Sequence, residues 1–188
     1  AVDLLPPAVA ELAKHERIVA IKEATGSLGR AAELRRLVGE DFAIMSGDDF
    51  TTMPFIAQGG DGCISVLSNI AAAPFIKMLE AIEFRNFASA RRIHLKLLPL
   101  IDALFVESNP TPVKTAAAWL NIIPTAELRL PLEPLTPAGM DVLERALLEA
   151  GLHPVREPGP PSTLGPSNLG DLESRAAQTI ELSQLPTA

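Results

Sequence analysis

The chain has 188 residues, of which 47% are hydrophobic and 21% are charged, and its formal net charge is -7. This composition is typical of a folded globular protein, and the length allows one core with an appendage. The acidic balance and the absence of a Lys/Arg cluster argue against binding to a nucleic-acid backbone, and no apolar run approaches the roughly 20 residues that span a bilayer.

The composition also limits the chemistry within the chain. A single cysteine, Cys63, excludes an intramolecular disulfide and is typical of a cytoplasmic protein, and its apolar surroundings favour a small buried side chain over a reactive thiol. The three histidines, His15, His94 and His153, show no metal-ligand spacing, so neither a metal nor a cofactor is predicted. The chain has no tyrosine, so it cannot itself supply a phenol as a proton shuttle.

The first 73 residues alternate between short apolar runs and helical patterns. Strands are expected at Ile18–Lys22, Phe42–Ser46 and Cys63–Leu67, and helices at Pro6–Lys14, Leu28–Val38 and Phe50–Gln58. Asp3 is expected to cap the first helix, and Gly39 to end the second. The strand spacing suits βα units, and the apolar strands indicate parallel pairing with burial on both faces.

Residues 74–152 are predicted to be helical. The expected helices are Pro74–Phe84, Phe87–Phe105, Thr111–Asn121 and Pro137–Ala150. Pro99 should kink or divide the second of these, and Thr136 should cap the last. Residues 153–188 are rich in Pro, Gly, Ser and Thr, which predicts a linker or disordered tail with at most a short helix at Asp171–Leu182.

Lys22 is the candidate nucleophile. Four apolar residues precede it, so it lies at the carboxyl end of a predicted buried strand, where active sites of parallel α/β proteins are found. Composition alone favours a solvated surface charge. Partial desolvation at a strand end would instead favour the neutral amine, which attacks a carbonyl to form a Schiff base. Glu23 points to the other face and is a poor direct partner.

Other polar motifs have a functional and a plain structural interpretation. Thr25-Gly26-Ser27 precedes a helix and could hold an anion, but simple N-capping is the commoner case. Asp48-Asp49 could form a metal or acid/base pair, but one of them is more simply the cap of the next helix. The segment Glu107–Pro110 is interpreted as an interhelical loop, and Lys114 and Arg129 as surface charges.

Several motifs together resemble one known family. The segment IVAIKEATGSLGR resembles the Schiff-base segment of dihydrodipicolinate synthases, which are class I, pyruvate-dependent lyases. The resemblance continues in order through MSGDD, GGDGCISVLSNIA, FVESNPTPVK and LRLPLEPLT, and it runs from Val2 to about Leu152. The Lys22 segment alone is also similar to N-acetylneuraminate lyase and related sugar-acid aldolases, whereas the later motifs favour dihydrodipicolinate synthase.

The resemblance implies both a fold and a reaction. The implied fold is the C-terminal part of a (β/α)8 barrel, strands six to eight in residues 1–73, followed by a helical bundle in 74–152 and the tail in 153–188. Lys22 would form the imine with pyruvate, whose enamine would attack aspartate semialdehyde in lysine/diaminopimelate biosynthesis. The backbone carbonyl of Ile64 would face pyruvate, and Gly47 would leave room for substrate. Such lyases usually assemble as homotetramers.

The sequence also departs from the family. The threonine pair that contacts pyruvate, the tyrosine shuttle and the arginine that receives the second substrate's carboxylate have no counterpart here. Because the sequence begins within a helical pattern and not with Met, we expect a fragment that is inactive or nearly so and prone to self-association. Two alternatives are a pyruvate-linked sugar-acid lyase and a non-catalytic remnant that pairs with a separate N-terminal half.

Overall fold

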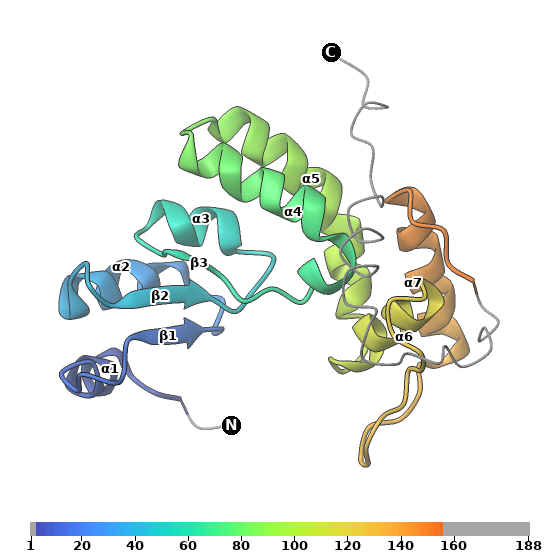
Figure 1. Ribbon diagram of the computed structural model, residues 1–188, viewed down its shortest axis with the longest axis horizontal. Helices are drawn as coiled ribbons and strands as arrows, with labels where there is room; N and C mark the ends of the chain where they lie inside the picture. Colours follow the sequence, from blue (N-terminus) through green and yellow to red (C-terminus); the bar gives the residue numbers. More distant parts are fainter. Residues whose placement is uncertain (1–2, 156–188) are drawn as a thin grey trace, which may run out of the picture. The chain divides into compact units, whose positions relative to one another are not determined.

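The computed structural model describes residues 3–155, which form two compact units (Figure 1). The first, the sheet unit, contains the residues up to Val66 together with Leu79–Ala90. The second, the helical unit, contains Leu67–Met78 together with the described residues from Arg91 onward. Residues 156–188, which make up most of the predicted tail, lie outside the described residues. The predicted boundary between the barrel segment and the helical region at residue 73 stays a prediction.

The sheet unit alternates strands with helices, as predicted. Its elements are α1 (Pro6–Leu12), β1 (Ala20–Glu23), α2 (Leu28–Val38), β2 (Ala43–Ser46), α3 (Thr52–Ala57) and β3 (Gly62–Cys63). The three strands pair in parallel in the order β1-β2-β3 (Figure 1). In this register Lys22 lies opposite Met45, and Ser46 lies opposite Cys63, so the carboxyl ends of the strands share one edge.

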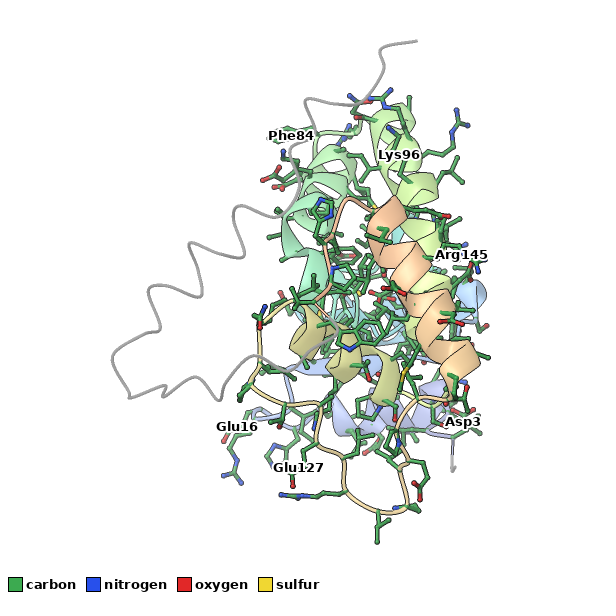
Figure 2. All side chains as sticks on the ribbon, turned by 90° about the vertical axis from the view of Figure 1, so that its right-hand side faces the viewer. Asp3, Glu16, Phe84, Lys96, Glu127 and Arg145 are labelled. Atoms are coloured by element: carbon green, nitrogen blue, oxygen red, sulfur yellow. The ribbon has the colours of Figure 1, made fainter. Side chains whose placement is uncertain are left out.

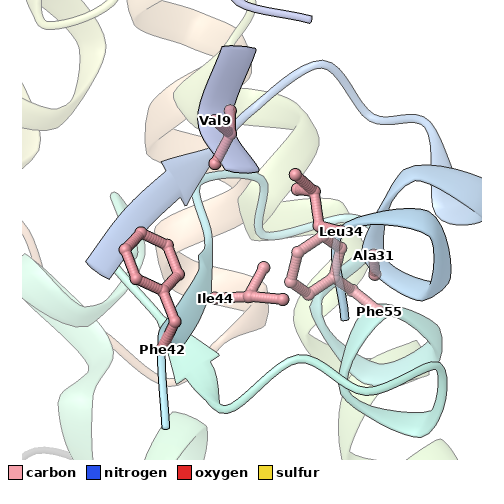
Figure 3. Close-up of a cluster of buried hydrophobic side chains, with 6 residues drawn as sticks. All are labelled: Val9, Ala31, Leu34, Phe42, Ile44 and Phe55. Carbon is pink, nitrogen blue, oxygen red and sulfur yellow. The ribbon is translucent and has the colours of Figure 1, made fainter. Parts of the chain in front are cut away.

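The core of the sheet unit lies between the helices and one face of the strands. Its buried side chains come from α1, α2, β2 and α3 and from the residue before β2, and they meet in a single cluster (Figure 3): Val9, Ala31, Leu34, Phe42, Ile44 and Phe55. Ile44 on β2 is fully buried, because a central strand is covered by its neighbours as well as by the helices. Gly39 ends α2 with a φ of 75°, as the sequence predicted.

Three local predictions for this unit are wrong. β1 is not buried on both faces, because it lies at the sheet edge, and Ala20 and Lys22 are exposed. The third strand ends at Cys63 and not at Leu67, since the amide of Val66 donates to a side chain, that of Asp49, at 2.9 Å. Asp3 does not cap α1, because its carboxylate accepts a hydrogen bond from Arg30 at 2.9 Å.

The helical region is built from α4 (Ser68–Glu83), α5 (Phe87–Leu104), α6 (Thr111–Trp119) and α7 (Pro137–Glu149). Within the helical unit α6 packs against α7, and the most deeply buried side chains include those of Leu100, Ile101, Leu104, Leu143 and Leu147. Charged residues such as Lys96 on α5 and Arg145 on α7 are exposed (Figure 2).

The predicted helix boundaries and proline break in this region are only partly confirmed. Thr136 caps α7 as predicted, because its hydroxyl oxygen accepts a hydrogen bond from the amide of Gly139 at 3.1 Å. Pro99 does not divide α5, which continues through it as one helix of 18 residues. α4 begins at Ser68, six residues before the predicted start, and contains a non-helical residue at Ala71. Among the described helices, none combines the length and apolar character that crossing a membrane requires.

Candidate functional site at the carboxyl ends of the strands

Lys22 is the third residue of β1, near the carboxyl end of the strand. Strand alternation places its side chain on the face opposite that of Glu23, so Lys22 is exposed while Glu23 is buried. The predicted position at a strand end is therefore present, but the predicted partial desolvation is not. The physical reason is that β1 pairs with a neighbour on one side only among the described residues.

Gly47 follows β2 and lies directly against the Lys22 side chain. An ideal Cβ at Gly47 would lie 2.6 Å from Lys22 Cε and 2.6 Å from the Cβ of Ala24, which is closer than any real contact. The amide of Gly47 also donates to the carbonyl of Glu23 at 2.7 Å. Only glycine therefore lets the chain after β2 pass this close to the carboxyl end of β1.

Ile64 is the first residue after β3, and 48% of it is exposed. Its amide donates a hydrogen bond to the carbonyl of Ser46 at 2.7 Å. Ser46 directly precedes Gly47, so the predicted site residues Lys22, Gly47 and Ile64 are connected through the turn that follows β2. All three lie within the sheet unit.

Glu23 anchors the segment that follows Lys22. Its Oε1 accepts a hydrogen bond from the amide of Thr25 at 2.6 Å, and its Oε2 lies 3.1 Å from Nε of Arg30 in an ion pair that lacks hydrogen-bond geometry. Arg30 also donates to Asp3, and this bond lowers the pKa of the Asp3 carboxyl and raises the pKa of the Arg30 guanidinium. These contacts hold the turn between β1 and α2 in place.

That turn does not form a side-chain cap. Ser27 occupies the N-cap position of α2, as plain N-capping predicts, but its hydroxyl makes no capping hydrogen bond. The amide of Ser27 donates instead to the hydroxyl of Thr25 at 3.3 Å. Gly26 has a φ of 74°, a conformation that favours glycine.

Asp48 and Asp49 have different roles. The carboxylate of Asp48 accepts hydrogen bonds from the amide of Phe50 at 3.3 Å and from the hydroxyl of Thr51 at 2.6 Å, both of which precede α3. The predicted cap is wrong, because α3 begins at Thr52, its N-cap residue is Thr51, and no side chain caps it. The Asp49 residue is 1% exposed, and its carboxylate accepts from Val66. Among residues 3–155, no group of three His, Cys, Asp or Glu side chains is placed to hold a metal ion.

Cys63 lies beside two polar side chains, those of Thr52 and Asp49. Its Sγ is 3.1 Å from Oγ1 of Thr52, and its thiol donates to Oδ1 of Asp49 at 3.9 Å. Burial raises the pKa of the Cys63 thiol to about 11, and the Asp49 charge acts in the same direction. The thiol therefore stays protonated near neutral pH, which agrees with an unreactive side chain.

The motifs singled out in the helical unit support its loops and helix ends. Oε1 of Glu107 accepts hydrogen bonds from the amide and the hydroxyl of Thr136 at 3.1 and 2.6 Å, so Glu107 holds the start of α7. The ammonium of Lys114 donates to the carbonyl of Glu127, which Figure 2 shows in the loop between α6 and α7. Arg129 lies in the same loop and is exposed, as predicted for a surface charge.

Sequence reasoning missed a polar contact between α2 and the residue that precedes β3. The guanidinium of Arg35 donates to the Asp61 carboxylate at 2.5 Å, and the same carboxylate accepts from the amide of Ile44 at 2.6 Å. Arg35 and Asp61 are 26 residues apart and carry no shared motif. No sequence signal indicated this contact, because Arg35 lies on α2 and Asp61 lies in the turn before β3.

The family of the chain follows from its similarity to known proteins. The family model described as "Dihydrodipicolinate synthetase family" matches residues 1–150. The chain belongs to this family. A curated relative from Erwinia tasmaniensis, named 4-hydroxy-tetrahydrodipicolinate synthase, is 48% identical over 150 residues, which are 80% of this chain and 51% of the relative.

Solved structures of the family also match. Dihydrodipicolinate synthase from Aquifex aeolicus has a TM-score of 0.76 at 37% identity and covers 81% of this chain and 52% of its own. The Acinetobacter baumannii enzyme, solved in complex with pyruvate, has a TM-score of 0.75 at 36% identity, covering 80% of this chain and 51% of its own. The predicted family and barrel-type fold class are thus confirmed, and the chain spans about half the length of these relatives.

Proposed function

We propose that this chain carries the imine-forming segment of a 4-hydroxy-tetrahydrodipicolinate synthase, with Lys22 as the nucleophile that attacks pyruvate. The observation that carries the proposal is the placement of Lys22 near the carboxyl end of a parallel strand, packed against a glycine that admits no side chain. The names of the relatives, at 45–48% identity, support this lyase over the sugar-acid lyases.

The first step is imine formation. The lone pair of the neutral Lys22 amine attacks the ketone carbon of pyruvate, and loss of one water molecule from the resulting carbinolamine gives the Schiff base. Loss of a proton from the methyl group then gives an enamine. The enamine carbon attacks the aldehyde of aspartate semialdehyde to form the new carbon–carbon bond. The amino group of the condensed product then attacks the imine carbon, and this cyclisation expels the Lys22 amine as the leaving group.

Gly47 and Ile64 are proposed as substrate-binding residues. Gly47 leaves the volume beside Lys22 open, because any Cβ there would displace the lysine side chain. Ile64, whose amide donates to the carbonyl of Ser46, would present its own backbone carbonyl to pyruvate. The proposal includes neither a metal nor a cofactor, since the amine itself supplies the electrophile activation that imine chemistry requires.

Complete turnover is not expected from this chain alone. The family resemblance assigns proton transfer to a tyrosine, and this chain contains none. Residues that act as a unit lose most of their effect when one is absent, so we expect imine formation without efficient condensation. The proposal extends to a cytoplasmic place in lysine/diaminopimelate biosynthesis and to the homotetrameric assembly implied by the resemblance.

The decisive test is reductive trapping of the full chain with pyruvate and borohydride, followed by peptide mass spectrometry. We expect the pyruvate adduct on the peptide that contains Lys22 and no comparable adduct on the exposed Lys14 or Lys96. Lys22→Arg, which retains the charge but has no nucleophilic amine at neutral pH, should abolish the adduct. Equal labelling of all three lysines would contradict the proposal.

A second arm tests the role of Gly47. In Gly47→Ala the new methyl group must displace Lys22 or Ala24, so we expect trapping to fall by about 10-fold or more, as misplacement of a reacting group predicts. Gly29→Ala is the matched control, because a Cβ at Gly29 meets no atom within 4 Å. Trapping with N-acetylneuraminate in preference to pyruvate would support the sugar-acid lyase alternative.

A further inference from the structure

Asp49 is a buried carboxylate that the proposed chemistry does not use. It lies in the turn after β2, and its exposed fraction is 1%. Burying a carboxylate is costly unless hydrogen bonds compensate for the lost water. Its Oδ2 accepts a hydrogen bond from the amide of Val66 at 2.9 Å, and its Oδ1 accepts a weak one from the thiol of Cys63 at 3.9 Å.

These two partners lie on either side of Ile64. Cys63 is the last residue of β3, and Val66 is the second residue after Ile64. Ile64 itself donates its amide hydrogen to the carbonyl of Ser46 at 2.7 Å. Ser46 and Asp49 therefore hold the segment from Cys63 to Val66 at three points, and two of these contacts, the weak one from Cys63 and the one from Val66, are to the Asp49 carboxylate.

We propose that Asp49 is a positioning residue that holds the Ile64 peptide in place for pyruvate binding, an inference that rests on the proposed function. A hydrogen bond to a carboxylate is stronger than one between neutral groups, so it fixes the backbone beyond what strand pairing provides. Without it, the hydrogen bond between the Val66 amide and the carboxylate is lost, and the segment after β3 relaxes. Asp49 then controls how tightly pyruvate binds and leaves the intrinsic reactivity of Lys22 unchanged.

The test measures trapping at Lys22 by the full chain as a function of pyruvate concentration. In Asp49→Ala we expect the half-saturating concentration to rise by about 10-fold, the usual effect of losing one hydrogen bond to a charged group. Reductive methylation of Lys22 by formaldehyde, which needs no carboxylate recognition, should stay within about 2-fold of the original rate. Asp49→Asn should restore half-saturation to within about 3-fold, because its amide oxygen can still accept from Val66.

A matched control is Asp48→Ala, which removes the same charge from the neighbouring position. The Asp48 carboxylate accepts from Phe50 and Thr51 just before α3, so half-saturation should change by less than about 2-fold. If circular dichroism shows that Asp49→Ala does not fold, Asp49→Glu replaces it in the same measurement. It retains the charge but shifts the oxygens by one methylene, and we expect about a 5-fold rise in half-saturation.

The outcomes separate the two proposals. Unchanged half-saturation in Asp49→Ala or in its Glu replacement, with a normal adduct in the unsubstituted chain, overturns the role of Asp49 alone. A parallel fall in formaldehyde methylation also overturns it, because that result reports general disorder around Lys22. Absence of any pyruvate adduct in the unsubstituted chain overturns the proposed function, and the role of Asp49 with it.

Discussion

The sheet unit and the helical unit have similarly buried leucines but differ in their buried polar residues. In the described part of the sheet unit, two carboxylates are buried at strand ends, those of Glu23 and Asp49. In the helical unit the buried polar residues are Thr111 and Thr115, and the hydroxyl of Thr115 donates to the carbonyl four residues earlier. Buried carboxylates thus mark the strand ends, where the candidate site lies, whereas the two buried threonines of the helical unit donate to carbonyls of its own backbone.

The largest effect tests the similarity of the two cores. Leu34→Ala in the sheet unit and Leu143→Ala in the helical unit each remove a fully buried side chain. Both should lower the free energy of unfolding by about 2–5 kcal/mol, measured by urea denaturation. Leu37→Ala is the control on α2, because Leu37 is 36% exposed and should cost less than about 1 kcal/mol. Costs that differ widely between Leu34 and Leu143 would show that the cores are not alike.

The second prediction concerns the buried charge of the sheet unit. Glu23→Ala removes the carboxylate that pairs with the Arg30 guanidinium and that accepts from the Thr25 amide. We expect a loss of about 2–3 kcal/mol in unfolding free energy, below the full cost of an isolated buried pair because Asp3 still binds Arg30. Glu23→Gln, which keeps the acceptor for Thr25, should be intermediate. A cost below 0.5 kcal/mol for the alanine variant, on the order of a surface substitution, would contradict the anchoring role.

The third prediction uses the thiol at the same sheet edge. With a pKa of about 11 against an ordinary value of 9.0, Cys63 should react with iodoacetamide at pH 8 about 100-fold more slowly than the unfolded chain. Because the folded state holds this proton more tightly, the thiol's contribution to stability is complete below about pH 9. It is then lost as the pH rises toward about 11. Alkylation of the folded chain at the unfolded rate would show that the thiol is open to solvent.

The smallest effect tests the helical unit's pattern of capping. Thr136→Ala removes the hydroxyl that caps α7 and that Glu107 binds, and it should cost about 1 kcal/mol by thermal unfolding. Thr136→Ser retains the hydroxyl and should lose only a few tenths of that. A loss for Thr136→Ala that equals or exceeds the Glu23→Ala loss would remove the proposed contrast between a buried charge and an exposed cap.

Local sequence patterns predicted much of the fold because the causes are local. Helix α2 begins and ends where predicted, since Gly39 can adopt the positive φ that ends it. Thr136 was recognisable as a cap because the residues it serves are its immediate neighbours. The edge exposure of β1 was not predictable, because apolar composition does not reveal which neighbours a strand pairs with.

The sequence by itself determined the family, the three parallel strands and the choice of Lys22 as candidate nucleophile, because motifs and periodicity lie in consecutive residues. Tertiary structure decided that Gly47 lies against Lys22 and that Glu23 and Asp49 anchor the turns on either side of the site. Those contacts join residues that only the parallel register brings together at the carboxyl ends of the strands. Glu23, which the sequence offered only as a poor partner for Lys22, and Asp49, which it offered as a metal, acid/base or cap candidate, become buried anchors when the strands pair.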